Sequence, residues 1–182
     1  CIRDRLLIAR LKGGLGNQLF CYAAARRLAW FNKAELILDT VTGFKYDYRY
    51  RRRYALHAFC LPTRVATRSE RLEPLGRVRH LIAHKIALGM PLEERRYIRQ
   101  IGVRFDPDIL TLRLKDGITY FDGFGQSELY FNDIRELILQ DLAMTPPSDK
   151  QTLAIANEIV ASSSVCLHVR WFDNGQNLHS AN

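Results

Sequence analysis

The strongest constraint on the fold is a strand, a glycine turn, a helix and a second strand within the first forty residues. The apolar run 6–11 suits a buried strand and is closed by the glycine turn 12–17. Apolar residues at three- and four-residue spacing predict a helix over 18–31, and 34–39 reads as the second strand. This strand–helix–strand order predicts a parallel sheet and therefore an α/β, Rossmann-like fold.

The rest of the chain is less regular until residue 117. Residues 41–91 are rich in Arg and Tyr and read as loops and short basic helices. A third strand is predicted at 118–121, followed by a loop, and Ser127 is predicted to cap the next helix. Pro146 and Pro147 should end that helix and start another, and a last strand is predicted over 165–170.

Length and composition support one large core and not two. The chain has 182 residues, of which 47% are hydrophobic and 25% charged, and a typical domain has roughly 100 to 150 residues. No run reaches the ~20 apolar residues of a membrane helix, and no secretory signal opens the chain. The four cysteines lie far apart, which argues against a disulfide framework and favours a reducing compartment. Because the chain begins at Cys1, we expect part of the natural amino terminus to be missing.

The net charge of +8 is concentrated in one segment. Residues 45–104 hold 15 of the 27 Lys and Arg and 5 of the 19 Asp and Glu, a local balance of +10, whereas the remainder sums to −2. Such a segment suits an anionic ligand, a nucleic acid or an acidic membrane surface, and charge alone does not choose among them.

Two short motifs could carry chemistry. Backbone N–H groups of the turn 13–17, at the start of a helix, favour an anion, although from these residues alone a purely structural turn is the better explanation. Asn17 could cap the helix or reach a ligand hydroxyl. The strand end with His168, Arg170 and Asp173 offers an imidazole, a guanidinium and a carboxylate, and Arg suits a diphosphate.

Two apparent metal motifs are discounted. His80 and His84 lack the Glu of a zinc helix, so we expect surface helix residues there. Asp106-Pro107-Asp108 resembles a glycosyltransferase metal motif but is also a common helix start. We expect no metal site.

Several segments together resemble one family, the bacterial α-1,2-fucosyltransferases of glycosyltransferase family 11. The resemblance spans nearly the whole chain, in the family's order and at about its spacing. It is carried by residues 13–26, by 38–40 with the Tyr/Arg-rich 45–59, by 122–131 and by His168-Val169-Arg170.

The resemblance implies an enzyme with two lobes, of the GT-B type, inverting and metal-independent. Such an enzyme transfers L-fucose from GDP-β-L-fucose to a galactoside hydroxyl, usually O2. It implies no cofactor beyond the donor substrate. It also implies catalytic roles for His168, Arg170 and Asp173, and substrate-binding roles for Gly14, Gly16, Asn17, Gln18, Asp122 and Gln126.

The chain departs from the family pattern at two points. Trp171 replaces the second Arg of the family's His-x-Arg-Arg-x-Asp motif, and the sequence ends soon after it. We therefore expect residues 1–160 to form the amino-terminal lobe and 161–182 to begin a largely missing donor lobe. The expected location is cytoplasmic, and the basic segment 45–104 allows peripheral contact with the inner face of a bacterial membrane.

A second hypothesis comes from another class. The interleaved Tyr and Arg residues of 46–54 could hold single-stranded nucleic acid by stacking and phosphate contacts. The motif series favours the fucosyltransferase, for which no nucleic acid is expected.

The catalytic motif gives a first prediction. The 182-residue chain should show no measurable fucosyl transfer because the donor pocket should lie in the missing lobe. In a version extended by that lobe, Arg170→Ala should lower turnover on the order of 10²-fold or more, because a charge-assisted contact to the leaving group is lost. Trp171→Arg should raise turnover. A transfer assay with GDP-fucose and a galactoside tests this, and an active Arg170→Ala enzyme would remove Arg170 from the mechanism.

Overall fold

The structure is a computed structural model that describes residues 5–146, 149–167 and 169. The chain divides into two compact units, Cys1–Thr145 and Pro146–Asn182. The expected boundary between two lobes near residue 160 stays a prediction.

The first unit is built on a five-stranded, entirely parallel sheet in the order β3-β2-β1-β5-β4. This confirms the predicted α/β class with a Rossmann-like parallel sheet. Both neighbours of the central strand β1 were predicted, but the two edge strands were not, because they are only two and three residues long. The strands are β1 (Arg5–Arg10), β2 (Glu35–Asp39), β3 (Arg64–Val65), β4 (Tyr97–Arg99) and β5 (Gly117–Asp122).

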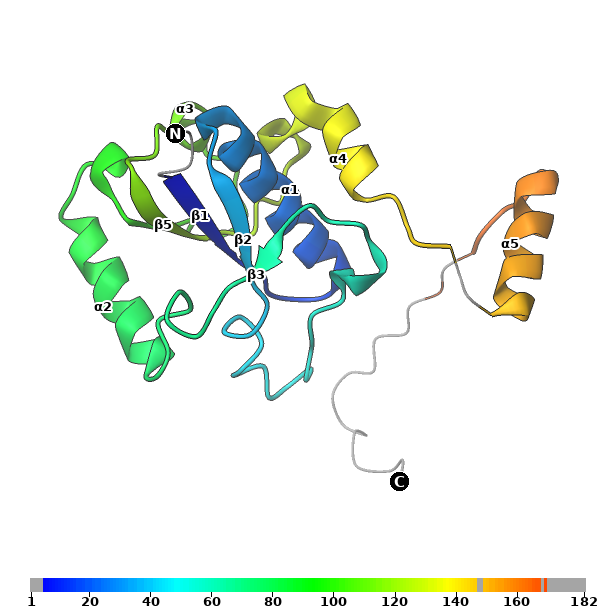
Figure 1. Cartoon of the computed structure of the whole chain (residues 1–182), viewed down its shortest axis with the longest axis horizontal. Helices are drawn as coiled ribbons and strands as arrows, with labels where there is room; N and C mark the ends of the chain where they lie inside the picture. The colour runs from blue at the N-terminus through cyan, green and yellow to red at the C-terminus, as the bar shows by residue number, and fades with distance from the viewer. Residues whose placement is uncertain (1–4, 147–148, 168, 170–182) are drawn as a thin grey trace. The chain divides into compact units, whose positions relative to one another are not determined.

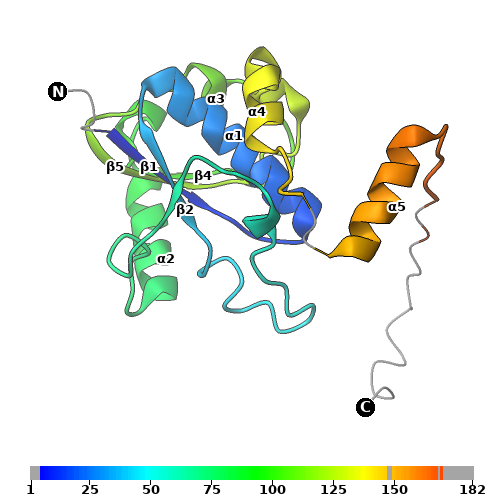
Figure 2. The same ribbon diagram turned by 45° about the vertical axis from the view of Figure 1, so that its right-hand side comes forward.

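Alternate residues of the strands face two separate cores, as the period of two in a strand requires. Leu7 and Ala9 pack with α1, whereas Ile8 packs on the other face with Ala87 of α2. Figures 1 and 2 show α1 and α2 on opposite faces of the sheet. The helices of this unit are α1 (Leu15–Asn32), α2 (Gly76–Leu88), α3 (Asp108–Thr111) and α4 (Arg135–Asp141).

The helix predicted after Ser127 is interrupted. Ser127 caps as expected, since its Oγ accepts a hydrogen bond from the Leu129 backbone N–H at 3.3 Å. However, the cap opens only a short 3₁₀ turn, Glu128–Tyr130, which a second turn, Asn132–Ile134, separates from α4. Tyr130 and Ile134 are buried in the same core as α1, and this burial holds the two short turns in place before α4.

The second unit contains one helix within its described residues, α5 (Lys150–Ala161). Asp149 caps it, accepting a hydrogen bond from the Thr152 N–H at 2.7 Å, which confirms the predicted helix start. The strand expected over 165–170 is not found at 165–167 or 169, where Val165 and Leu167 are exposed. A strand needs a hydrogen-bonded neighbour, and the described residues of this unit offer none.

Within the described ranges, no helix has both the length and the apolar character needed to cross a bilayer.

Asn32 joins the end of α1 to the segment leading into β5. Its Nδ2 donates hydrogen bonds to the carbonyl oxygens of Leu28 (2.9 Å) and Leu112 (3.0 Å), and its Oδ1 accepts one from the Leu114 N–H (2.8 Å). The side chain is buried, so if the amide were removed, no water would replace it as the hydrogen-bond partner of these backbone groups.

We predict that Asn32→Ala lowers the free energy of unfolding by about 3 kcal/mol, because buried backbone groups of Leu112 and Leu114 lose their partners. Urea unfolding followed by circular dichroism measures the change. Asn132→Ala, at an exposed position, is the matched control and should change stability by less than about 0.5 kcal/mol. Equal effects of both substitutions would contradict this role for Asn32.

Candidate functional site

The candidate site lies where the parallel strands end. Arg10, Asp39, Arg99 and Asp122 are the last residues of β1, β2, β4 and β5, so four charged side chains meet at one edge of the sheet. In open α/β sheets, ligands bind outside this carboxyl edge, where neighbouring connections leave in opposite directions. Here β1 lies between β2 and β5. The chain runs from β1 through α1 to β2 on one side, and it reaches β5 on the other side only after crossing from β3 to β4, the opposite edge strand.

Asp122 is the centre of the site. Its carboxylate accepts from Lys12 Nζ at 2.6 Å, Arg10 Nη1 at 3.1 Å and the Tyr97 hydroxyl at 3.2 Å. Burial by itself would raise the pKa of this carboxyl group, but the charges and hydrogen bonds of Lys12 and Arg10 outweigh burial and lower the pKa to about 2. Asp122 is therefore an ionised anchor for two cations and a weak proton acceptor.

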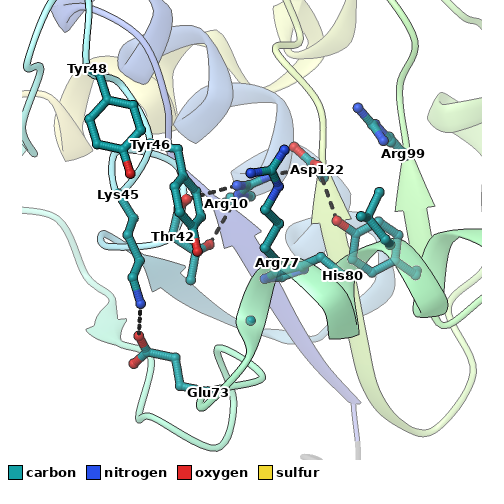
Figure 3. A pocket seen from close by; sticks show the side chains of 13 residues that line it. Arg10, Thr42, Lys45, Tyr46, Tyr48, Glu73, Arg77, His80, Arg99 and Asp122 are labelled. Atoms are coloured by element: carbon teal, nitrogen blue, oxygen red, sulfur yellow. Dashed lines mark hydrogen bonds and ion pairs between the residues drawn. The ribbon is translucent and has the colours of Figure 1, made fainter.

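A second buried carboxylate organises the neighbouring strand end. Asp39 Oδ1 accepts hydrogen bonds from the backbone N–H groups of Val41 (3.0 Å) and Thr42 (2.9 Å), and its Oδ2 accepts from the hydroxyls of Thr42 and Tyr120. Arg10 connects the two carboxylate centres because it also donates to the Thr42 hydroxyl (3.1 Å) and carbonyl (2.8 Å). Figure 3 shows Arg10 between Thr42 and Asp122.

A cavity of about 500 Å³ opens over these groups. Arg10, Asp122 and Tyr97 line it from the sheet, and the exposed side chains of Tyr46, Tyr48, Arg77 and Arg99 also line it (Figure 3). Its lining thus combines aromatic faces with hydrogen-bond donors, and its volume lies within the usual range of small-ligand sites.

His80 corrects one expectation. It was predicted on the helix surface but is buried beneath the cavity, with its ring centroid 4.7 Å from that of Tyr120 and 5.6 Å from that of Tyr97. Neither ring nitrogen has a hydrogen-bond partner within the described residues. Burial and the nearby Arg10 charge lower the pKa of His80, which favours the neutral imidazole. No group of metal-binding side chains is found in the described part of the chain.

Asp106-Pro107-Asp108 acts as a helix start, as one of its two interpretations predicted. Asp106 Oδ1 accepts a hydrogen bond from the Asp108 N–H at 3.1 Å, and α3 begins at Asp108.

The glycine turn and the loop after β5 meet through their side chains. Asn17 does not cap α1, whose N-cap is Gly14 with no side-chain hydrogen bond. Instead, Asn17 Oδ1 accepts from Gln126 Nε2 at 2.6 Å, which joins two predicted site residues that are 109 positions apart. Gly13 has φ +79°, and a Cβ there would lie 2.5 Å from Asn17 Nδ2, so glycine is required at this position. Gly14 and Gly16, by contrast, face open space.

Gln18 holds the Tyr/Arg-rich segment against the turn. Its buried amide donates to the carbonyls of Gly13 (3.0 Å) and Arg53 (2.9 Å) and accepts from the Ala55 N–H (2.8 Å). Both amide hydrogens are thus used within the protein. Substrate contact by Gln18 stays a prediction beside this structural role.

The predicted catalytic residues His168, Arg170 and Asp173 lie outside the described residues, so their catalytic roles stay a prediction. The sequence interpretation missed the lining residues Arg10, Tyr97 and Arg99, and also Lys12, which pairs with Asp122. A signal existed for Arg10, the charged residue near the end of the predicted strand 6–11. None existed for Tyr97 and Arg99, because a three-residue strand inside a basic segment has no visible periodicity.

No family model matches the chain, and no curated protein or solved structure shows significant similarity to it.

The Asp122 centre gives a prediction about acid stability. Its pKa falls from the ordinary 3.8 to about 2 in the folded chain, so the carboxylate stabilises the fold by about 2 kcal/mol above pH 4. That contribution should be lost as the pH falls through about 2. We expect Asp122→Asn to lower the free energy of unfolding by at least this amount at neutral pH, with a difference from wild type that shrinks below pH 4.

Urea titrations across this pH range measure the effect. Asp116→Asn is the matched control. Asp116 lies directly before β5, and its ion pair with Arg5 is exposed to solvent, so this pair should contribute less than about 1 kcal/mol to the free energy of unfolding. A pH-independent loss in Asp122→Asn would show that packing, and not the carboxylate charge, accounts for the change.

Proposed function

We propose that this chain forms the amino-terminal lobe of a GT-B type, inverting galactoside 2-α-L-fucosyltransferase. The observation that carries the proposal is the meeting of two family-like segments, 13–18 and 122–126, at the carboxyl edge of the sheet. The Asn17–Gln126 hydrogen bond joins the two segments, and Lys12, directly before the first segment, pairs with Asp122 of the second. Asp122 also lines the cavity, which connects this meeting point to it.

The cavity suits a sugar acceptor. A galactoside presents hydroxyls and an apolar ring face, and the lining offers charged donors beside the rings of Tyr46 and Tyr48. Lys12 also lies over the Phe124 ring, with Nζ 4.3 Å from its centroid, which places a cation beside the loop 122–126. We propose that these groups bind the acceptor, and that Asp122 acts through Arg10 and Lys12.

The proposed reaction is a single displacement at the anomeric carbon of fucose. The acceptor oxygen attacks that carbon, the bond to the GDP phosphate oxygen breaks, and the acceptor proton passes to a base. A cation must stabilise the charge growing on GDP, and Arg170 is the proposed group. Asp122 is a poor choice of base because its pKa is already about 2. His168 and Asp173 remain the proposed candidates for proton transfer.

The nucleic-acid alternative finds less support in the Tyr/Arg-rich segment. Arg52 and Arg49 lie over the Tyr50 ring, at 4.1 and 5.2 Å from its centroid, and Arg77 lies 5.3 Å from that of Tyr46. Guanidinium groups of the chain itself therefore already occupy ring faces that bases would need for stacking.

We predict saturable binding of a neutral galactoside such as lactose, measured by saturation-transfer NMR and calorimetry. Tyr46→Ala should weaken binding about tenfold, because a lining aromatic surface is lost. Tyr50→Ala is the matched control. It removes another exposed tyrosine of the same segment (56% exposed, against 43% for Tyr46) that does not line the cavity, so the affinity should stay unchanged.

Two outcomes would contradict the proposal. One is the absence of galactoside binding by a folded chain. The other is tight binding of a single-stranded oligonucleotide at physiological salt that Tyr50→Ala reduces, since this would favour the nucleic-acid module.

A further inference from the structure

Helix α2 presents a row of large apolar side chains to solvent. Val78, Ile82 and Ile86 recur every four residues, and Leu81 and Leu88 flank them, all between 48% and 57% exposed. We call these five residues the outer face of α2. The opposite side of the helix packs on the sheet through His80 and Ala87. Figures 1 and 2 show α2 lying along one face of the sheet. The helix is therefore apolar on the side that a globular protein normally makes polar.

Cations without an ion-pair partner border this face. Arg79 and Lys85 form no ion pair within the described residues, and α2 contains no acidic residue. Arg77 forms none there either, but it lies over the Tyr46 ring and lines the cavity. Helical geometry places Lys85 between Leu81 and Ile82 on the face itself.

The acidic residues on either side of α2 are mostly neutralised. Glu70 pairs with Arg64 at 2.7 Å and Glu73 pairs with Arg71 at 2.9 Å, both before the helix. After it, Glu94 lies 3.8 Å from Lys115, and Glu93 is exposed. The positive charge of α2 is therefore available to an external anion.

An apolar groove adjoins the same face. It has a volume of about 320 Å³, and Ile86, Met90, Ile118 and Tyr120 contribute to its mainly apolar lining. Ile86 belongs to both the groove and the outer face, so exposed apolar surface continues from the helix toward the sheet.

We propose that the outer face of α2 docks on an anionic lipid bilayer, with the helix parallel to the membrane plane. The apolar row would enter the boundary between headgroups and acyl chains, and Arg79 and Lys85 would bind lipid phosphates. Interfacial helices combine these features, namely an apolar side bordered by Lys and Arg and no membrane-spanning length. A protein partner is a poorer fit because it would have to bury Lys85 in the middle of the apolar row. This inference does not depend on the proposed fucosyl transfer.

Co-sedimentation with unilamellar vesicles tests the proposal. We expect the chain to bind phosphatidylcholine vesicles containing about one-third phosphatidylglycerol, with weaker binding to phosphatidylcholine alone and at high salt. Lys85→Glu should weaken binding at least about fivefold, from the attraction lost per basic residue. Ile82→Ser should weaken it about tenfold, from the apolar surface no longer inserted.

Two substitutions outside α2 serve as matched controls. Lys150→Glu makes the same charge change at an exposed position of α5, and Leu129→Ser removes an apolar side chain that is 55% exposed. Both should bind like wild type, and circular dichroism verifies folding of all four variants.

Three results would overturn the proposal. The first is no sedimentation with anionic vesicles, and the second is binding that the α2 variants and the controls change equally. The third is concentration-dependent self-association that Ile82→Ser abolishes, without vesicle binding, which would make the outer face a contact between copies of this chain.

Discussion

The ion pairs of Asp122 with Arg10 and Lys12 hold together the edge where β1 and β5 end. Taking a carboxylate out of water is costly, and it is offset here by two cations and the Tyr97 hydroxyl. These contacts fix the direction in which the chain leaves β1 toward the glycine turn, and the direction in which it leaves β5 toward the loop that contains Gln126. The positions of Asn17 and Gln126 follow from this arrangement.

The same contacts divide the chemical roles within the candidate site. Lys12 and Arg10 keep the Asp122 carboxylate ionised, so it is suited to orienting these cations. A general base that accepts a proton near neutral pH needs a higher pKa than that of Asp122. Arg10 and Lys12 keep part of their side chains accessible, and Arg10 lines the cavity. Under the proposed function, substrate contact would fall to the cations and aromatic rings, and proton transfer to groups outside this edge of the sheet.

Helix α2 has two sides with different tasks. One side covers the sheet and contributes His80 and Arg77 to the cavity, while the other exposes the outer face to solvent. Its position follows from topology, because the chain must cross from β3 at one edge of the sheet to β4 at the other. If both proposals hold, a membrane-docked α2 would keep the cavity close to lipid headgroups and to any acceptor attached to them.

The sequence by itself determined the α/β class, the unit from β1 to β2, β5, the cap at Ser127 and a helix start after Pro147, because local periodicity and capping chemistry specify these features. It also marked Asn17, Asp122 and Gln126 as site residues, through motif resemblance. Only the tertiary structure decided that Asn17 bonds to Gln126, that His80 is buried and that Tyr97 and Arg99 line the cavity. These contacts join residues far apart in the chain, and the short strand β4 is stabilised by its pairing with β5 and not by its own sequence pattern.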